Sequence, residues 1–189
     1  MPPTVTADPV RRRAAVVATA IAVPVAVLLA LALNRGELRG NKPAAPSPTV
    51  ARLSALPPVV VPPPAASAAG VRACPKLIDG LPVTLGDLLG RPVRSSSSLV
   101  LAWGEPPVVL RCGVGRPGFA AGGPDLFAVN GVTWLVRPEP DGKSFVWTTV
   151  DREVYIQVRV PTGYAAAPIS PISDAVKKTL TAVPVRPDK

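Results

Sequence analysis

The chain has 189 residues, with 26 prolines, no histidine and a formal net charge of +9. The absence of histidine removes the commonest general base at neutral pH, the usual partner of a catalytic serine and the commonest metal ligand. Residues 1–70 hold seven Lys/Arg and two Asp/Glu, and residues 71–189 hold fourteen and ten, so the later part carries +4 without a nucleic-acid-binding motif. We therefore expect no nucleic-acid partner, no bound metal and no cofactor.

The first 33 residues have the pattern of a membrane anchor. Residues 1–13 form a short basic tail that ends in Arg11, Arg12 and Arg13, and residues 14–33 contain no charged side chain. A helix of that length spans roughly 30 Å, the thickness of the hydrocarbon core of a bilayer. The arginine triplet favours a cytoplasmic N-terminus, which predicts a single-pass protein of the cell membrane with its remainder outside.

A cleaved signal peptide is the alternative for residues 14–33. The apolar region of a signal peptide is normally 7 to 15 residues long, shorter than this one. Ala30, Leu31 and Ala32 nevertheless offer a small-x-small cleavage pattern. Both alternatives place the following residues outside the cell.

Residues 34–70 are rich in proline and alanine and have no hydrophobic periodicity. Such a composition predicts an extended, polyproline-like linker that holds a domain away from the bilayer. A docking peptide for a proline-recognising partner is the alternative.

Residues 71–189 have the pattern of one folded domain. Cys74 and Pro75 begin a predicted short helix that ends at Gly80, and a second short helix is predicted over residues 85–89. Asn130-Gly131 and Asp141-Gly142 predict tight hairpin turns. The predicted strands are 99–103, 108–112, 126–129, 132–136, 144–150 and 153–160.

A C-terminal helix completes the predicted domain. Ser170 and Pro171 are typical of a helix start, and Ile172, Val176 and Leu180 recur at spacings that produce one apolar stripe. Since the strands follow one another through tight turns, the predicted fold is α+β, with an antiparallel sheet of about five or six strands covered by this helix.

Cys74 and Cys112 are the two cysteines of the chain. Outside the cell they most simply form one disulfide between the first helix and the second strand of the domain. A redox pair or a zinc site is the alternative, but the chain has no C-x-x-C motif and two thiolates without histidine are an incomplete zinc site.

Catalytic chemistry would depend on carboxylates. Asp151 and Glu153 lie two residues apart, and a glycosidase-type site needs two carboxylates about 5–10 Å apart across a cleft. The other acidic residues of the domain fall in predicted turns and caps, where aspartate is common for conformational reasons. We therefore predict no catalytic residues and no enzymatic activity.

Three tryptophans lie in or at the ends of predicted strands: Trp103, Trp134 and Trp147. Packing in the core is one interpretation of these positions. The other is an aromatic platform for a sugar ring or a peptide, which requires that the tryptophans share an exposed face.

Several short motifs resemble one bacterial envelope family. They are Cys74-Pro75 with Leu81-Pro82, the run from Trp103-Gly104 to Arg111-Cys112-Gly113, Val129-Asn130-Gly131-Val132 with Trp134, and the run from Thr148 to Tyr155. Residues 71–183 are similar to domain of unknown function 3515, found mainly in high-GC actinomycete-type bacteria. The resemblance implies a membrane-tethered or secreted domain with paired cysteines, and it implies no reaction.

These observations predict a membrane-anchored extracytoplasmic domain that serves as a non-catalytic binding or interaction module of the cell envelope. The expected partners are the lipid bilayer, through residues 14–33, and a cell-wall polymer or a membrane protein. The alternatives are a carboxylate-dependent cell-wall hydrolase and a regulatory partner of a membrane protein complex. Two close carboxylates in a cleft would favour the hydrolase, and an exposed aromatic or apolar patch would favour the binding module.

Overall fold

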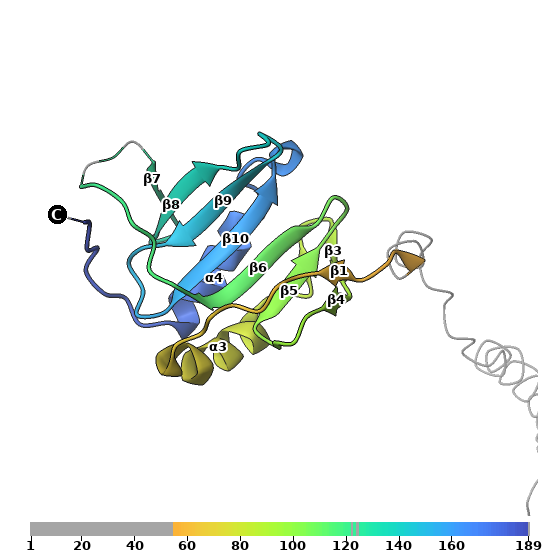
Figure 1. Cartoon of the computed structure of the whole chain (residues 1–189), viewed down its shortest axis with the longest axis horizontal. Helices are drawn as coiled ribbons and strands as arrows, with labels where there is room; N and C mark the ends of the chain where they lie inside the picture. Colours follow the sequence, from red (N-terminus) through yellow and green to blue (C-terminus); the bar gives the residue numbers. More distant parts are fainter. Residues whose placement is uncertain (1–54, 122, 124, 189) are drawn as a thin grey trace, which may run out of the picture. The chain divides into compact units, whose positions relative to one another are not determined.

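The fold is built on one eight-stranded antiparallel sheet (Figure 1). The computed structural model describes residues 55–121, 123 and 125–188. Two helices, α3 (Ala68–Gly80) and α4 (Ile169–Thr179), pack on one face of the sheet. The α+β class and the C-terminal helix are thus confirmed. The predicted basic tail, the membrane segment 14–33 and residues 34–54 of the predicted linker lie outside the described residues.

The strands follow the order β2-β3-β5-β6-β10-β9-β8-β7 across the sheet. Their bounds are β2 Thr84–Leu85, β3 Leu88–Arg91, β5 Val100–Trp103, β6 Val108–Val114, β7 Leu126–Val129, β8 Val132–Pro138, β9 Ser144–Thr149 and β10 Tyr155–Pro161. The last four strands form a meander, and β10 pairs with β6 on its other side. The β6–β10 pairing therefore joins the two halves of the sheet.

Six of the eight strands correspond to predicted ones, and the predicted short helix over residues 85–89 is wrong. Those residues form the β2–β3 hairpin instead, which raises the strand number above the predicted five or six. Gly86 has φ +60°, a left-handed conformation that glycine adopts without steric cost. It allows the chain to turn back on itself and is incompatible with a continuous helix. Leu85 is buried, while Leu88 and Leu89 are half-buried.

Helix α3 is longer than predicted and begins earlier. The Ser67 hydroxyl caps it by accepting a hydrogen bond from the Gly70 N–H at 3.2 Å, so Pro75 lies inside the helix rather than in its first turn. The stretch predicted as linker contributes further structure, because β1 (Val59–Val60) pairs in parallel with β4 (Val93–Arg94). Residues 59–70 thus lie on the folded domain, before its predicted start at residue 71.

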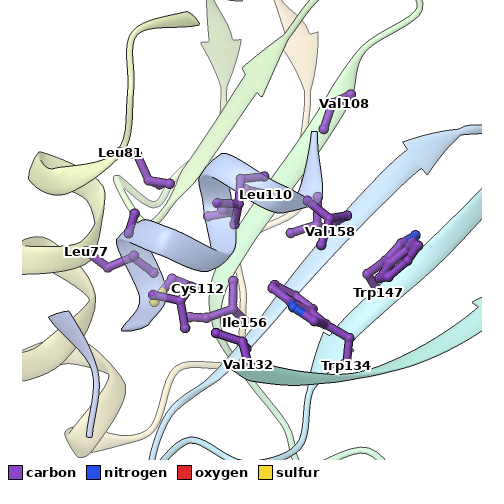
Figure 2. Packing of buried hydrophobic residues seen from close by; sticks show 14 of the residues in the cluster. Leu77, Leu81, Val108, Leu110, Cys112, Val132, Trp134, Trp147, Ile156 and Val158 are labelled. Carbon is purple, nitrogen blue, oxygen red and sulfur yellow. The ribbon is translucent and has the colours of Figure 1, made fainter. Parts of the chain in front are cut away.

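The side chains between the sheet and the helices form the main core. Figure 2 shows Leu77 of α3 and Val132 of β8 in this core with the buried residues of β6 and β10. Ile172 and Val176 of α4 are fully buried in it, which confirms the predicted apolar stripe. A smaller cluster lies on the opposite face, where Val61 packs against Val100, Ala102 and Val109.

The hairpin turn at Asn130-Gly131 is confirmed, with φ values of 50° and 81°. The Asn130 side-chain amide also donates hydrogen bonds to the Ser170 hydroxyl at 3.0 Å and to the Asp174 carboxylate at 2.9 Å. Ser170 therefore does not cap α4, whose N-cap position is Pro168. Its hydroxyl instead holds the hairpin tip against the first turn of the helix.

The predicted disulfide is confirmed and lies where α3 meets β6. Cys74 and Cys112 are bonded, with their Cα atoms 5.8 Å apart, and both are fully buried. The backbones approach closely beside them: a Cβ at Gly70 would lie 3.2 Å from the Gly113 Cα, and one at Gly113 would lie 2.9 Å from the Ala66 Cβ. Gly113 also has φ +86°, so glycine is required there on both counts.

We predict that replacing both cysteines with alanine lowers the free energy of unfolding by about 3–4 kcal/mol, because the disulfide closes a long loop in the unfolded chain. Denaturant unfolding of the purified chain and the double variant measures the difference. Alkylation of the unaltered chain in denaturant should modify no thiol before reduction and two after it. Two thiols that react without reduction would reject the bond.

Candidate functional site

The face of the sheet opposite the helices carries a row of polar and charged side chains at its centre. Alternation along β10 buries Ile156 and Val158 on the helix side and places Gln157 and Arg159 on the opposite side. Pairing then aligns Gln157 with Arg111 of β6 and with Thr148 of β9. The outer faces of β6, β10 and β9 thus carry these polar side chains, while their inner faces pack in the core.

The neighbouring row on this face carries two further arginines of the candidate site. Arg159 lies opposite Val109 of β6 and Val146 of β9, and Val146 lies opposite Arg137 of β8. Since neighbouring strands are about 4.8 Å apart, the backbones at Arg137 and Arg159 are separated by roughly 10 Å. Arg111, Arg137 and Arg159 therefore lie within one small area.

Two segments cover the ends of this face and leave its centre open. On one side lie residues 59–62, hereafter the strap, in which the Val59 and Val61 N–H groups donate to the carbonyls of Pro92 and Arg94 at 2.9 and 3.1 Å. On the other side the loop after β6 crosses the sheet, and Arg137 donates to the Gly118 carbonyl at 2.6 Å. In Figure 1 the chain between β1 and α3 passes in front of β5 and β6, while α4 lies behind the sheet.

A groove runs between these two segments and consists of two adjoining hollows. The first, of about 210 Å³, is lined by the strap and by Val109, Arg111 and Arg159 among others. The second, of about 350 Å³, is lined by residues that include Leu135, Arg137 and Thr148. Both share Glu139, Val146 and Gln157. We call this continuous surface the outer groove.

Three arginines and one glutamate set the charge of the outer groove. Arg159 Nε donates to the Glu139 carboxylate at 2.5 Å, and Arg111 donates to the Gln157 side-chain carbonyl at 3.2 Å. Arg111 Nε is buried and makes no hydrogen bond in the described structure. Guanidinium groups form bidentate hydrogen bonds with carboxylates and phosphates, so the groove is suited to an anionic ligand.

The chain matches the family model described as Protein of unknown function (DUF3515) over residues 17–185. The chain belongs to this family. No curated protein and no solved structure matches it. The match extends beyond the stretch 71–183 on which the sequence resemblance rests.

The three tryptophans of this DUF3515 chain are buried. Trp103 donates its indole N–H to the Pro82 carbonyl at 3.2 Å, and Trp134 donates to the Ser173 hydroxyl at 3.0 Å. Trp147 packs edge-on to Trp134, with ring centroids 6.5 Å apart, as Figure 2 shows. Their burial favours the core-packing interpretation over a shared exposed platform.

The carboxylate of Asp151, considered above as a catalytic candidate, is held in place by structural contacts. One of its oxygens accepts from the Thr133 N–H at 2.8 Å, and the other lies 2.9 Å from the guanidinium of Arg152. Arg152 is 2% exposed and donates to the carbonyls of Asp151 and Gly131, each at 2.9 Å. The side chain of Glu153 is exposed. Asp151 and Arg152 thus tie the β7–β8 turn to the connection before β10.

A second charged cluster holds the chain just before the strap. Arg91, whose side chain is 5% exposed, forms an ion pair with Glu105 and donates to the Pro57 carbonyl at 2.8 Å. Nearby, burial raises the pKa of the Tyr164 phenol; a hydrogen bond with the Glu105 backbone opposes the rise, and the charge of Glu105 adds to it. These contacts hold the chain at the end of β5.

Residues 55–121, 123 and 125–188 contain no group of three or more acidic, cysteine or histidine side chains that could hold a metal ion. Neither helix of this part of the chain is long and apolar enough to cross a bilayer.

The sequence predictions did not select the residues of the outer groove. Gln157 and Arg159 occupy the polar positions of the period-two pattern in residues 153–160, which indicates only that they face away from the core. Arg111 is 46 residues before its paired partner Gln157. Arg137 lies on β8, two strands away from β10, and is 20 residues before Gln157. Strand order decides that these side chains meet, and no local pattern encodes it.

We predict that Arg152→Met lowers the free energy of unfolding by about 3–5 kcal/mol, because it leaves a mostly buried carboxylate and the Gly131 carbonyl without their partner. Thermal or denaturant unfolding measures the loss. Glu153→Gln, at the next position but exposed, is the control and should change stability by less than about 0.5 kcal/mol. Equal effects of the two substitutions would contradict a structural role for Arg152.

We predict that Arg159→Gln and Glu139→Gln each change the free energy of unfolding by less than about 1 kcal/mol, since the Arg159–Glu139 pair is partly exposed to solvent. Denaturant midpoints of the two variants test this. A loss of several kcal/mol in either would show that the pair holds the fold together, and the outer groove would then be a structural feature rather than a site.

Proposed function

We propose that the chain is a non-catalytic binding or interaction module of the cell envelope, and that the outer groove is its ligand site. One observation carries the proposal: an open hollow surface in which three arginines face a single glutamate. Charged side chains gathered on one half-covered sheet face are expensive to desolvate without a partner and are suited to binding an opposite charge.

The charge pattern supports binding rather than hydrolysis. A glycosidase-type site needs two carboxylates about 5–10 Å apart. Among the described residues that line the two hollows, Glu139 is the one carboxylate, and Arg159 neutralises it. These lining residues therefore do not supply the second carboxylate that such a site needs.

The anchored topology rests on the sequence alone. The uncharged residues 14–33, preceded by three arginines, support a single span with the domain outside the cell. The disulfide between Cys74 and Cys112 agrees with an oxidising compartment. A membrane protein complex or a component of the wall is then within reach of the groove.

Affinity capture from membranes tests this function. The full chain, solubilised in mild detergent, serves as bait beside two double variants. Arg137→Gln with Arg159→Gln removes two charges from the outer groove, and Arg72→Gln with Lys76→Gln removes two exposed charges from α3 as the matched control. We expect a component that the unaltered chain and the α3 variant retain and that the groove variant loses.

Two results together would reverse the proposal. The first is that no component depends on the groove arginines. The second is release of sugars from purified wall by the chain, with loss of this release on Glu139→Gln. That combination would favour the hydrolase.

A further inference from the structure

We propose that the outer groove binds an extended peptide segment of a partner protein, with acidic side chains placed between apolar ones. The proposal rests on the function proposed above and narrows its ligand from any envelope component to one chemical class. Four features of the groove carry it: its charge, its lining, its length and the shape of its floor.

The positive charge of the groove favours a ligand with carboxylate groups. Arg137 and Arg159 lie on one row of the sheet face with Val146 between them, and Arg111 is diagonal to Arg159. In an extended chain, residues i and i+2 point to the same side and lie roughly 7 Å apart, at about 3.3 Å per residue. Two acidic side chains at these positions can each reach one of the two arginines, because the long arginine side chains bridge the remaining distance, and the one at Arg159 competes with Glu139.

The apolar lining of the groove favours a ligand with apolar side chains next to its carboxylates. The accessible apolar lining includes Val60 and Pro62 in the first hollow and Pro138 and Pro140 in the second, and both hollows share the half-buried Val146. A hydrophilic phosphate polymer gains nothing from such walls, whereas valine or proline side chains bury apolar area in them. A sugar ring prefers an aromatic face, and the residues that line the two hollows in the described structure include no aromatic side chain.

The floor suits a chain that lies flat across the strands. It is the face of β6, β10, β9 and β8, four strands that span roughly 15 Å, or about five residues of an extended peptide. At its centre Gln157 and Thr148 supply an amide and a hydroxyl, which are partners for the backbone of the ligand. In extended peptides alternate side chains point to the same side, so apolar side chains can enter both hollows together.

The N-terminal part of this chain does not fit as the occupant. Residues 1–54 contain seven Lys/Arg and only Asp8 and Glu37 as acidic residues, so their charge has the same sign as that of the groove. The occupant that complements the groove is therefore a segment of another protein, with a local excess of Asp and Glu.

Selection from a library of random twelve-residue peptides tests the proposal. The full chain in detergent is the target, and the variant with Arg137→Gln and Arg159→Gln is used for counter-selection. We expect the enriched peptides to combine Asp or Glu with Val, Leu or Pro. Binding of a synthetic enriched peptide should weaken about tenfold or more in the groove variant and remain unchanged in the variant with Arg72→Gln and Lys76→Gln.

Two further measurements make the result specific. Methyl NMR of the full chain should show that the peptide perturbs Val109, Leu135 and Val146. A version of the peptide with Gln and Asn in place of Glu and Asp should bind about tenfold more weakly, and poly(glycerol phosphate) should not compete at equal charge concentration.

The following outcomes would overturn the proposal. They are enrichment of no peptide that depends on the groove arginines, perturbation of methyl groups outside the groove, or equal binding of the neutral peptide. If poly(glycerol phosphate) competes effectively, the ligand of the groove is a wall polymer and not a peptide. In each of these cases, a membrane component that still depends on the groove arginines would leave the broader binding function standing.

Discussion

The pairing of β10 with β6 is the contact on which the rest of the structure depends. β10 follows the three preceding strands of its meander through local turns, but β6 precedes it by more than 40 residues, and their register brings Ile156 beside Cys112 and Gln157 beside Arg111. One register therefore sets both faces. A slip of one residue would expose Ile156 and Val158 and would bury Gln157 and Arg159, which is why the hydrophobic pattern of β10 fixes the pairing so strongly. The core and the outer groove are two consequences of the same alignment.

Helix α3 stabilises the pairing of β6 with β10 from the buried face of the sheet. The bond between Cys74 and Cys112 fastens the helix to β6, and the absence of side chains at Gly70 and Gly113 lets the two backbones approach. The end of α3 also lies against α4, where a Cβ at Gly80 would be 3.3 Å from the Thr179 Cγ2. The helices and the buried face thus form one rigid support. Side chains on the opposite face of the same strands gain from this support, since a binding site is best held by regular structure whose own packing is complete.

Features encoded by neighbouring residues could be predicted from the sequence, and features that depend on strand order could not. Asn130-Gly131 specifies its turn by two residues that tolerate positive φ, and the stripe of Ile172 and Val176 specifies its helix. The spacing of Leu85, Leu88 and Leu89 is compatible with a helix as well as with a hairpin. The residues form strands because Gly86 has a positive φ and because β3 pairs with β5. Residues 59–62 have the composition of a polyproline linker, yet they lie along β4 because Val61 finds an apolar site on β5 and β6. The groove could not be predicted for the same reason: Arg137 and Arg159 lie on strands of one meander, but Arg111 comes near them only through the long-range pairing of β6 with β10.

The strap gives the outer groove a property that its strands alone would lack. It forms one wall of the first hollow, and it is held by backbone hydrogen bonds to Pro92 and Arg94 and by the burial of Val61, while Arg91 contacts Pro57 just before it. These are few contacts for a segment that continues directly into the residues predicted to tether the domain. The ligand proposed for the groove would touch the strap and β10 at once. Its binding would then stabilise the docked strap by the same free energy by which the docked strap strengthens binding, so the proposed site would be thermodynamically linked to the chain that leads to the predicted anchor.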